Sequence, residues 1–165
     1  FRKSIELRAA EITEVKRHPE ADKLYIETLD DGSGEARTIV SGLVPHYQEE
    51  ELLGRTIIIV ANLKPAKLRG VKSHGMLLAA SDKDAEGNER VEVLFVDHAK
   101  PGERIVLEGD DAEAFQVERL PRLKIDNFFE VPIAADAYEI KVGSTRLVCA
   151  GTPVRSQEVK DGTVG

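Results

Sequence analysis

The sequence predicts a mainly β protein, with one small barrel followed by a smaller β-rich unit. Short apolar runs rich in β-branched residues recur along the first 108 residues, and glycine, proline or aspartate separates them. A single segment between these runs has a helical composition. The pattern changes after residue 108, so we expect one domain over residues 1–108 and a second over residues 109–165.

The first expected strand is long and bent. Apolar and polar residues alternate over residues 5–15, and the alternation changes phase after Ile12, which predicts a bulge. Pro19 should end the strand, because its ring fixes φ and restricts the preceding residue. The next two strands are expected over residues 24–29 and 37–42.

A short helix is expected over residues 48–53, where Gly54 ends it. The run 56–61 is apolar throughout, so this strand should be buried on both sides. The remaining segments of the barrel are expected to be strands over 76–80, 91–96 and 104–107, with a charged turn over 82–90. Short strands of this kind, the first one long and bent, with a helix between the third and the fourth, are typical of the five-stranded OB-fold barrel.

The second unit is expected to begin with a helix over residues 112–119. Later in this unit, Gly143-Ser144 separates two alternating runs, 138–142 and 145–149. This arrangement predicts a β-hairpin, so the second unit should be β-rich as well.

The composition is that of a globular protein with an acidic balance. Its 23 Lys and Arg oppose 30 Asp and Glu, for a net charge of −7. No run approaches the ~20 apolar residues of a membrane helix, and the chain opens with neither a signal-peptide core nor an initiator methionine. The single cysteine, Cys149, excludes an internal disulfide and favours a small buried side chain in a reducing compartment. We therefore expect a cytoplasmic fragment of a longer protein, without a membrane partner.

Motifs for catalysis or cofactor binding are missing from the sequence. It contains no nucleophile elbow, P-loop or dinucleotide fingerprint, and its four histidines lack the i, i+4 spacing of a helical metal pair. We therefore expect no catalytic residue, no metal and no cofactor in this chain.

One basic segment, residues 62–76, departs from the acidic balance, and Pro65, Gly70 and Gly75 predict that it forms a loop. It carries Lys64, Lys67, Arg69 and Lys72 and no acidic residue. The acid-free window around it, residues 52–81, also includes Arg55, so this window has a charge of +5 while the rest of the chain has −12. Solvated faces normally mix the two signs. The segment therefore predicts an anionic partner, and nucleic-acid phosphate is the hypothesis we pursue.

A folded RNA fits this segment better than an extended single strand. Single-strand binders stack bases on aromatic rings, and no aromatic residue lies between Tyr47 and Phe95. Asn62 and Ser73 add neutral groups that suit phosphate and ribose oxygens. Five phosphate contacts would give a log–log salt slope of roughly −3.5 to −4.5.

Three ordered segments resemble the signature of the tRNA-binding OB-fold family. They are residues 18–25 (HPEADKLY), 37–43 (RTIVSGL) and 62–76 (NLKPAKLRGVKSHGM). That family includes the C-terminal domain of methionyl-tRNA synthetases and the endothelial monocyte-activating polypeptide. Residues 154–157 and 162–164 resemble the extra domain of the latter branch, which mimics a dimer interface. The resemblance implies that this chain is a monomer built as a pseudo-dimer.

The resemblance also implies a function and a set of RNA-binding residues. By position, with Lys72 added for its charge, the set comprises Arg37, Asn62, Lys64, Lys67, Arg69, Lys72, Ser73 and Met76. The implied activity is non-specific binding of the outer corner of folded tRNA, as a module joined to or associated with the catalytic body of a methionyl-tRNA synthetase. Aminoacylation would belong to that body. A protein-interaction scaffold or secreted cytokine-like factor stays open as an alternative, as does an oligosaccharide-binding barrel.

Overall fold

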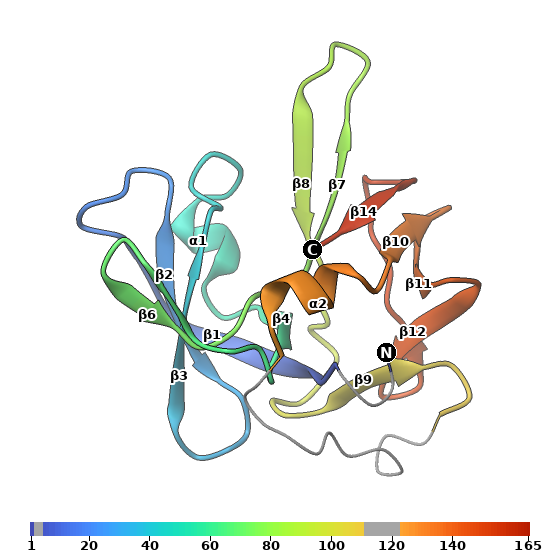
Figure 1. Ribbon diagram of the computed structural model, residues 1–165, viewed down its shortest axis with the longest axis horizontal. Helices are drawn as coiled ribbons and strands as arrows, with labels where there is room; N and C mark the ends of the chain where they lie inside the picture. Colours follow the sequence, from blue (N-terminus) through green and yellow to red (C-terminus); the bar gives the residue numbers. More distant parts are fainter. Residues whose placement is uncertain (2–4, 111–122) are drawn as a thin grey trace.

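The computed structural model of the chain describes residues 1, 5–110 and 123–165, and these residues form an antiparallel β architecture (Figure 1). Its elements are β1 (Leu7–Arg17), β2 (Tyr25–Asp30), β3 (Ala36–Ser41), α1 (Glu49–Leu52), β4 (Thr56–Val60), β5 (Ala66–Leu68), β6 (Val71–Ser73), β7 (Ala79–Lys83), β8 (Glu89–Val93), β9 (Arg104–Leu107), α2 (Ile125–Phe129), β10 (Ile133–Asp136), β11 (Glu139–Val142), β12 (Thr145–Cys149), β13 (Thr152–Pro153) and β14 (Gly162–Val164). The mainly β prediction is confirmed. None of the helices in the described part of the chain is long and apolar enough to cross a bilayer.

Strand β1 is the element around which the others are arranged. Its first half pairs with β4 over residues 7–11, and its second half pairs with β2 over residues 11–17. The register with β2 shifts between Ile12 and Glu14, which confirms the predicted bulge. The bulge bends the strand, and this allows it to take part in two stretches of sheet that face different directions.

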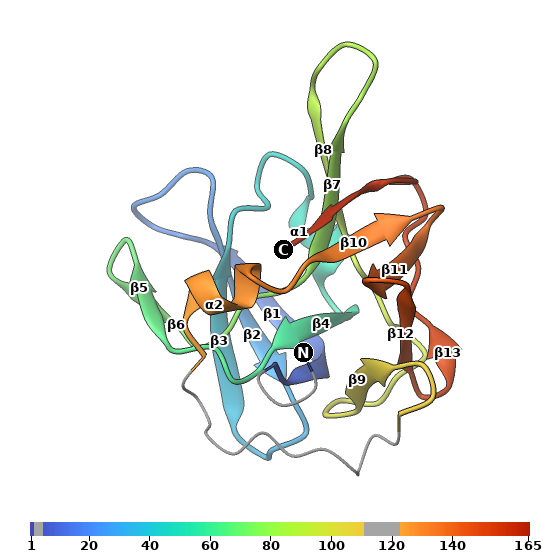
Figure 2. The same cartoon turned by 45° about the vertical axis from the view of Figure 1, so that its right-hand side comes forward.

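The strand pairing over the described residues is open. Its order is β3-β2-β1-β9-β12-β11-β10-β14-β7-β8, with β4 on β1 and β13 on β12, so β3 and β8 lie at the ends. The closed five-stranded barrel is therefore not established by this pairing and stays a prediction. A separate small sheet, β5 with β6, lies beside β3 (Figure 2).

Strand β4 separates two hydrophobic clusters. Ile58 and Val60 point into one cluster, while Ile57 and Ile59 point into the other, and every residue of the strand is buried. The prediction that this strand is buried on both sides is thus confirmed. It explains why the run is apolar throughout instead of alternating.

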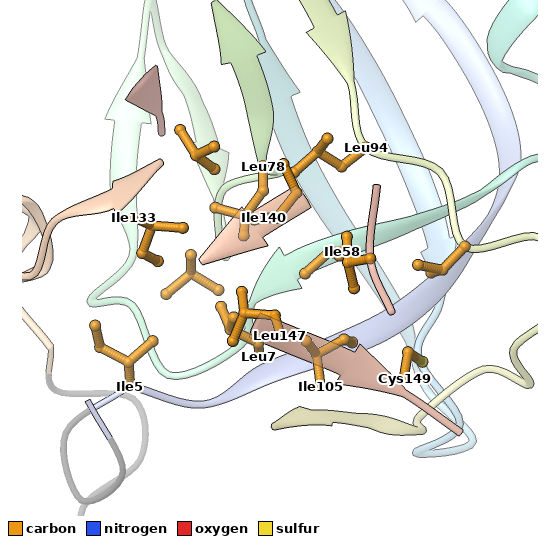
Figure 3. Close-up of a cluster of buried hydrophobic side chains, with 14 of the residues drawn as sticks. Ile5, Leu7, Ile58, Leu78, Leu94, Ile105, Ile133, Ile140, Leu147 and Cys149 are labelled. Carbon is orange, nitrogen blue, oxygen red and sulfur yellow. The ribbon is translucent and has the colours of Figure 1, made fainter. Parts of the chain in front are cut away.

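The segment after residue 123 shares the first of these clusters with the N-terminal strands. Figure 3 shows Ile133, Ile140 and Leu147 packed with Leu7 and Ile58. In addition, β12 pairs with β9 and β14 pairs with β7. The β-rich character of this segment and its hairpin β11–β12 are confirmed, whereas the expected helix over 112–119 lies outside the described residues. The division into two domains near residue 108 stays a prediction.

Cys149 lies at the end of β12 and belongs to the same cluster, with its side chain fully buried. Burial raises the pKa of the thiol to about 11, so the thiolate, which is the reactive form, is disfavoured. The prediction of a small buried side chain is confirmed.

Two local predictions need correction. Residues 62–76, which we expected to form a loop, contain the β5–β6 hairpin. Strands β7 and β8 extend into the predicted charged turn over 82–90, and they form a long arm that projects from the body (Figures 1 and 2). Strands β5 and β6 have only three residues each, and the outer halves of β7 and β8 are polar, so hydrophobic periodicity does not reveal their strand pairing.

Candidate nucleic-acid interface

The basic segment folds into a tight β-hairpin, which we call the basic hairpin (residues 66–73). Strands β5 and β6 pair in the register Ala66↔Ser73, Lys67↔Lys72 and Leu68↔Val71. The two turn residues, Arg69 and Gly70, have φ values of 53° and 88°. A two-residue hairpin loop with positive φ at both positions matches the right-handed twist of its strands. Arginine at the first position is unusual, because this conformation favours glycine, asparagine or aspartate.

Lys67 and Lys72 are direct cross-strand partners and therefore share one face of the basic hairpin. Both side chains are exposed, and neither forms an ion pair with any other residue that the structure describes. Two like charges in this position repel each other and destabilise the hairpin. A bound anion between them would remove that repulsion. Lys64, just before the hairpin, and Arg69, at its tip, are exposed as well.

A histidine from the β1–β2 connection holds the basic hairpin against the body. His18 Nε2 lies 3.1 Å from the Leu68 carbonyl oxygen, and the Glu20 amide donates to His18 Nδ1 over 3.0 Å. Because Nδ1 accepts, Nε2 must carry the proton and donate to Leu68. Arg69 Nη2 donates to the Glu20 carbonyl oxygen over 3.3 Å, so the tip is held by the same segment. His18 therefore has a structural role, because it joins the β1–β2 connection to the basic hairpin.

Asn62 and Ser73 lie inside the fold and not on its surface. Asn62 Oδ1 accepts a hydrogen bond from the Glu6 amide over 3.0 Å, which joins the start of the basic segment to β1. Ser73 Oγ accepts from the Val40 amide over 3.0 Å and donates to the Gly75 carbonyl oxygen over 3.0 Å. Both residues therefore position the hairpin. Nothing in the structure exposes either of them to a large ligand.

Arg37 is also occupied by contacts within the fold. Its Nε donates to Asp31 Oδ2 over 2.8 Å, and its Nη1 donates to the carbonyl oxygens of Ala61 and His74. The side chains of Arg37 and Asp31 are only 22% and 7% exposed. Burial alone would raise the pKa of Asp31, but hydrogen bonds from Ser33 and Arg37 outweigh it, and the pKa is lowered. Arg37 thus connects β3 to the carbonyl groups at both ends of the basic segment.

The surroundings of Arg37 carry charges of both signs. A cavity of about 500 Å³ lies next to it, and Glu6, Asp31 and Glu35 line this cavity together with Lys72 of the basic hairpin. Glu6 and Asp31 form ion pairs with Arg8 and Arg37. The cavity therefore extends from Arg37 to the basic hairpin, and the structural role of Arg37 rests on its ion pair and its hydrogen bonds to the two carbonyl groups.

Arg55, the fifth cation of the acid-free window, is neutralised by a residue from a distant segment. Its guanidinium forms an ion pair with Asp97 at 2.7 Å and stacks over the Phe95 ring at 3.7 Å. Met76, the last of the predicted RNA-binding residues, is half-buried against the first hydrophobic cluster. The structure therefore leaves four exposed cations, Lys64, Lys67, Arg69 and Lys72, on and beside the basic hairpin. No local pattern in the sequence relates either Asp31 or Asp97 to its arginine.

Together, the fold and these cations define an antiparallel β module with an exposed basic hairpin, a surface whose charge suits a polyanion. The chain belongs to the family described as the putative tRNA binding domain, whose model matches residues 7–104. That match contains the whole basic hairpin and the residues that hold it.

Relatives and solved structures agree with this family. The chain is 49% identical to a methionine–tRNA ligase of Treponema denticola and 44% identical to that of Treponema pallidum, in each case over its full length. It spans only 22% and 20%, about a fifth, of those ligases. The C-terminal domain of Plasmodium vivax p43 superimposes with a TM-score of 0.83 at 27% identity, covering 99% of this chain and 98% of that one. A MetRS-related protein of Pyrococcus horikoshii gives 0.52 at 31% identity, covering 61% and 88%.

Proposed function

We propose that this chain binds folded tRNA through the basic hairpin, by contacts to phosphate and ribose that carry little sequence preference. The observation that supports this most directly is the Lys67–Lys72 pair, which is exposed, rigidly placed and not neutralised by any described residue. Lys64 and Arg69 extend the positive surface along the hairpin. Four phosphate contacts predict a salt slope of about −2.8 to −3.6, lower than the five-cation value because Arg55 is engaged with Asp97.

The biological role that we propose is to raise the affinity of a methionyl-tRNA synthetase for tRNA. The relatives in which this region recurs are methionine–tRNA ligases. A tethered tRNA-binding module increases the local tRNA concentration at the catalytic body without contributing to the chemistry. The same proposal places the protein in the cytoplasm and the aminoacylation reaction in the ligase body. The scaffold, the cytokine-like factor and the oligosaccharide-binding barrel are not favoured, because the family is one of tRNA-binding domains.

Replacing Lys67 and Lys72 by glutamine together should weaken tRNA binding at low salt and flatten its salt dependence. Each lost phosphate contact removes about 0.7 to 0.9 from the salt slope, so the double variant should lose roughly 1.4 to 1.8. The loss should be similar for every tRNA, because phosphate contacts carry no sequence information. Filter binding with bulk tRNA and with two purified tRNAs, over a salt titration, measures both quantities.

Lys83→Gln provides the matched control, because Lys83 is an exposed lysine on the β7–β8 arm, away from the basic hairpin. It should leave the slope unchanged. An unaltered slope in the hairpin double variant, or an equal change in Lys83→Gln, would contradict the proposed interface. Arg69→Asn is a second variant of the hairpin, and it should also flatten the salt dependence because it removes a charge. Asparagine tolerates positive φ, so this change does not strain the turn.

We also propose that the first hundred residues form an OB-type barrel and that the rest of the chain takes the place of a second subunit. Residues 123–165 add strands to β9 and β7 and fill the cluster around Leu7 and Ile58. The Pyrococcus neighbour is matched over 88% of its own length but over only 61% of this chain, a share similar to that of the first hundred residues. In a protein that lacks the equivalent of residues 123–165, the surfaces that these residues cover here would need a second subunit to cover them.

The whole chain should accordingly sediment as a single chain. Its apolar strand faces are already covered, which removes the driving force for a dimer of the kind that buries a large apolar interface. Sedimentation equilibrium over a concentration series from low to high micromolar checks this. A dimer mass that persists at the lowest concentration would contradict the pseudo-dimer.

A further inference from the structure

A groove beneath the basic hairpin is the second feature that could contact RNA. The geometry points to a pocket for one unpaired nucleobase of the bound RNA, with the adjoining phosphate held by Lys64. This inference rests on the proposed function and adds a base-binding subsite to it.

The groove lies on the face of the basic hairpin opposite to Lys67 and Lys72. Ala66, Leu68 and Ser73 alternate with those lysines along the two strands and line the groove from one side. The end of β3 and the residues around Leu77 form its floor, and Ile125 of α2 lies across from the hairpin. Its volume is about 340 Å³, which is within the range of small-ligand sites.

The chemistry of the groove is apolar, with a single charged residue. Lys64 is the only charged side chain among the described residues that line it, and none of these lining residues is acidic. Leu68 and Ile125 are 40% and 50% exposed, so two of the large apolar side chains on the surface face this groove. Exposed apolar side chains that gather around a concave site indicate a binding surface, whereas isolated ones do not.

An aromatic ring also lies beside the groove, although none occurs within the basic segment itself. Phe129 is 55% exposed, and its ring lies against Gly165, which lines the groove. A Cβ at Gly165 would come within 2.6 Å of Phe129 Cε1, so only glycine permits this contact without a shift of the ring. The ring comes from α2, more than fifty residues after the basic hairpin. An exposed ring at such a site offers a face on which a base can stack.

An unpaired base matches these features better than an apolar peptide side chain does. A nucleotide combines a base, which has a flat apolar face, with a negatively charged phosphate a few bonds away. The groove supplies the apolar walls, and Lys64, which is part of its lining, supplies the cation. An apolar peptide would use the walls and leave Lys64 without a partner. Charge complementarity therefore selects the nucleobase.

A pair of RNA duplexes tests the inference. One is fully paired, and the other has the same sequence with a single unpaired adenosine at its centre. The wild-type chain should bind the bulged duplex roughly tenfold more tightly, the size of effect expected for stacking one base. Ala66→Phe fills the groove from the hairpin and should abolish the preference. Because Ala66 is part of the basic hairpin, the salt slope for bulk tRNA is measured on the same variant: a slope that is kept shows that the hairpin cations are still in place, since no cation is lost.

Ala85→Phe is the control, because it adds the same ring to the exposed turn of the β7–β8 arm. It should keep the preference. Equal affinity for the two duplexes alongside normal tRNA binding would overturn the base pocket and leave the proposed function standing. Absence of binding to tRNA and to both duplexes would overturn the proposed function itself. If Ala66→Phe keeps the preference for the bulge but weakens association with a methionyl-tRNA synthetase body, the groove binds protein and the inference is wrong.

Discussion

Replacing Glu27 by glutamine should stabilise the folded chain at neutral and alkaline pH, and the gain should grow with pH. Glu27 lies in the middle of β2, and its carboxyl group is fully buried. Its register partners are Val15 in β1 and Ile39 in β3, so the side chain enters the second hydrophobic cluster. The Ser41 hydroxyl donates to Oε1 over 2.5 Å, while Oε2 has no hydrogen-bond partner among the described residues.

Burial raises the pKa of Glu27 from 4.5 to about 8, because the charged form loses its hydration, and the hydrogen bond from Ser41 only partly opposes this. Between these two pH values the unfolded chain is ionised at this position, whereas the folded chain keeps the proton. The folded state then binds more protons than the unfolded state, so stability falls as the pH rises. The slope is about 1.4 kcal/mol per pH unit, which amounts to about 5 kcal/mol over the whole window.

Glutamine keeps the shape of the side chain but cannot ionise. The free energy of unfolding of Glu27→Gln, minus that of the wild type, should therefore be near zero or slightly negative at pH 4 and should rise by about 5 kcal/mol by pH 8 to 9. Urea denaturation at one-unit pH intervals measures this difference. Glu35→Gln, which alters an exposed glutamate in the β2–β3 turn, is the matched control and should show no such rise. A difference that does not change with pH would mean that Glu27 is already ionised in the fold.

These strands and their turns can be predicted from the sequence, because they depend on patterns among neighbouring residues. The alternation and phase change in residues 5–15 correspond to β1 and its bulge, and the uniformly apolar run 56–61 corresponds to a strand between two cores. The hairpin at Gly143-Ser144 is likewise a local signal. Each of these predictions depends on residues within about ten positions of each other.

The site could be predicted only in part, because its electrostatics depend on contacts between distant residues. The basic segment is visible as a gap in the acidic residues. However, Arg55 is neutralised by Asp97, 42 positions away, and the amide of Glu6 occupies the Oδ1 atom of Asn62, 56 positions away. The absence of aromatic residues around the segment is misleading for the same reason, since Phe129 of α2 lies against Gly165, which lines the neighbouring groove. Sequence patterns give the charge of a segment, and the fold decides which of those charges stay exposed.

Arg37 offers the sharpest distinction between a structural cation and an RNA-binding one. Replacing it by methionine should destabilise the fold by about 3 kcal/mol, because Asp31 would be left buried without its cation and two carbonyl groups would lose a donor. Asp31→Asn should destabilise it by a similar amount, and the double variant should cost less than the sum of the two, since the residues are coupled. Urea denaturation of the four proteins completes this cycle.

The RNA readout then separates the two roles of Arg37. If Arg37 acts only within the fold, neither Arg37→Met nor Asp31→Asn should change the salt slope for tRNA by more than a few tenths. The slope is measured at a temperature where both variants are folded. A phosphate-binding Arg37 predicts the opposite pattern. Arg37→Met would then lower the slope by about 0.7 to 0.9, and Asp31→Asn would strengthen binding by releasing the guanidinium. The partly buried ion pair at 2.8 Å and the two carbonyl groups to which Arg37 already donates favour the first pattern. On this reasoning the RNA-binding surface is confined to the basic hairpin and its groove, and Arg37 contributes by fixing where that hairpin lies.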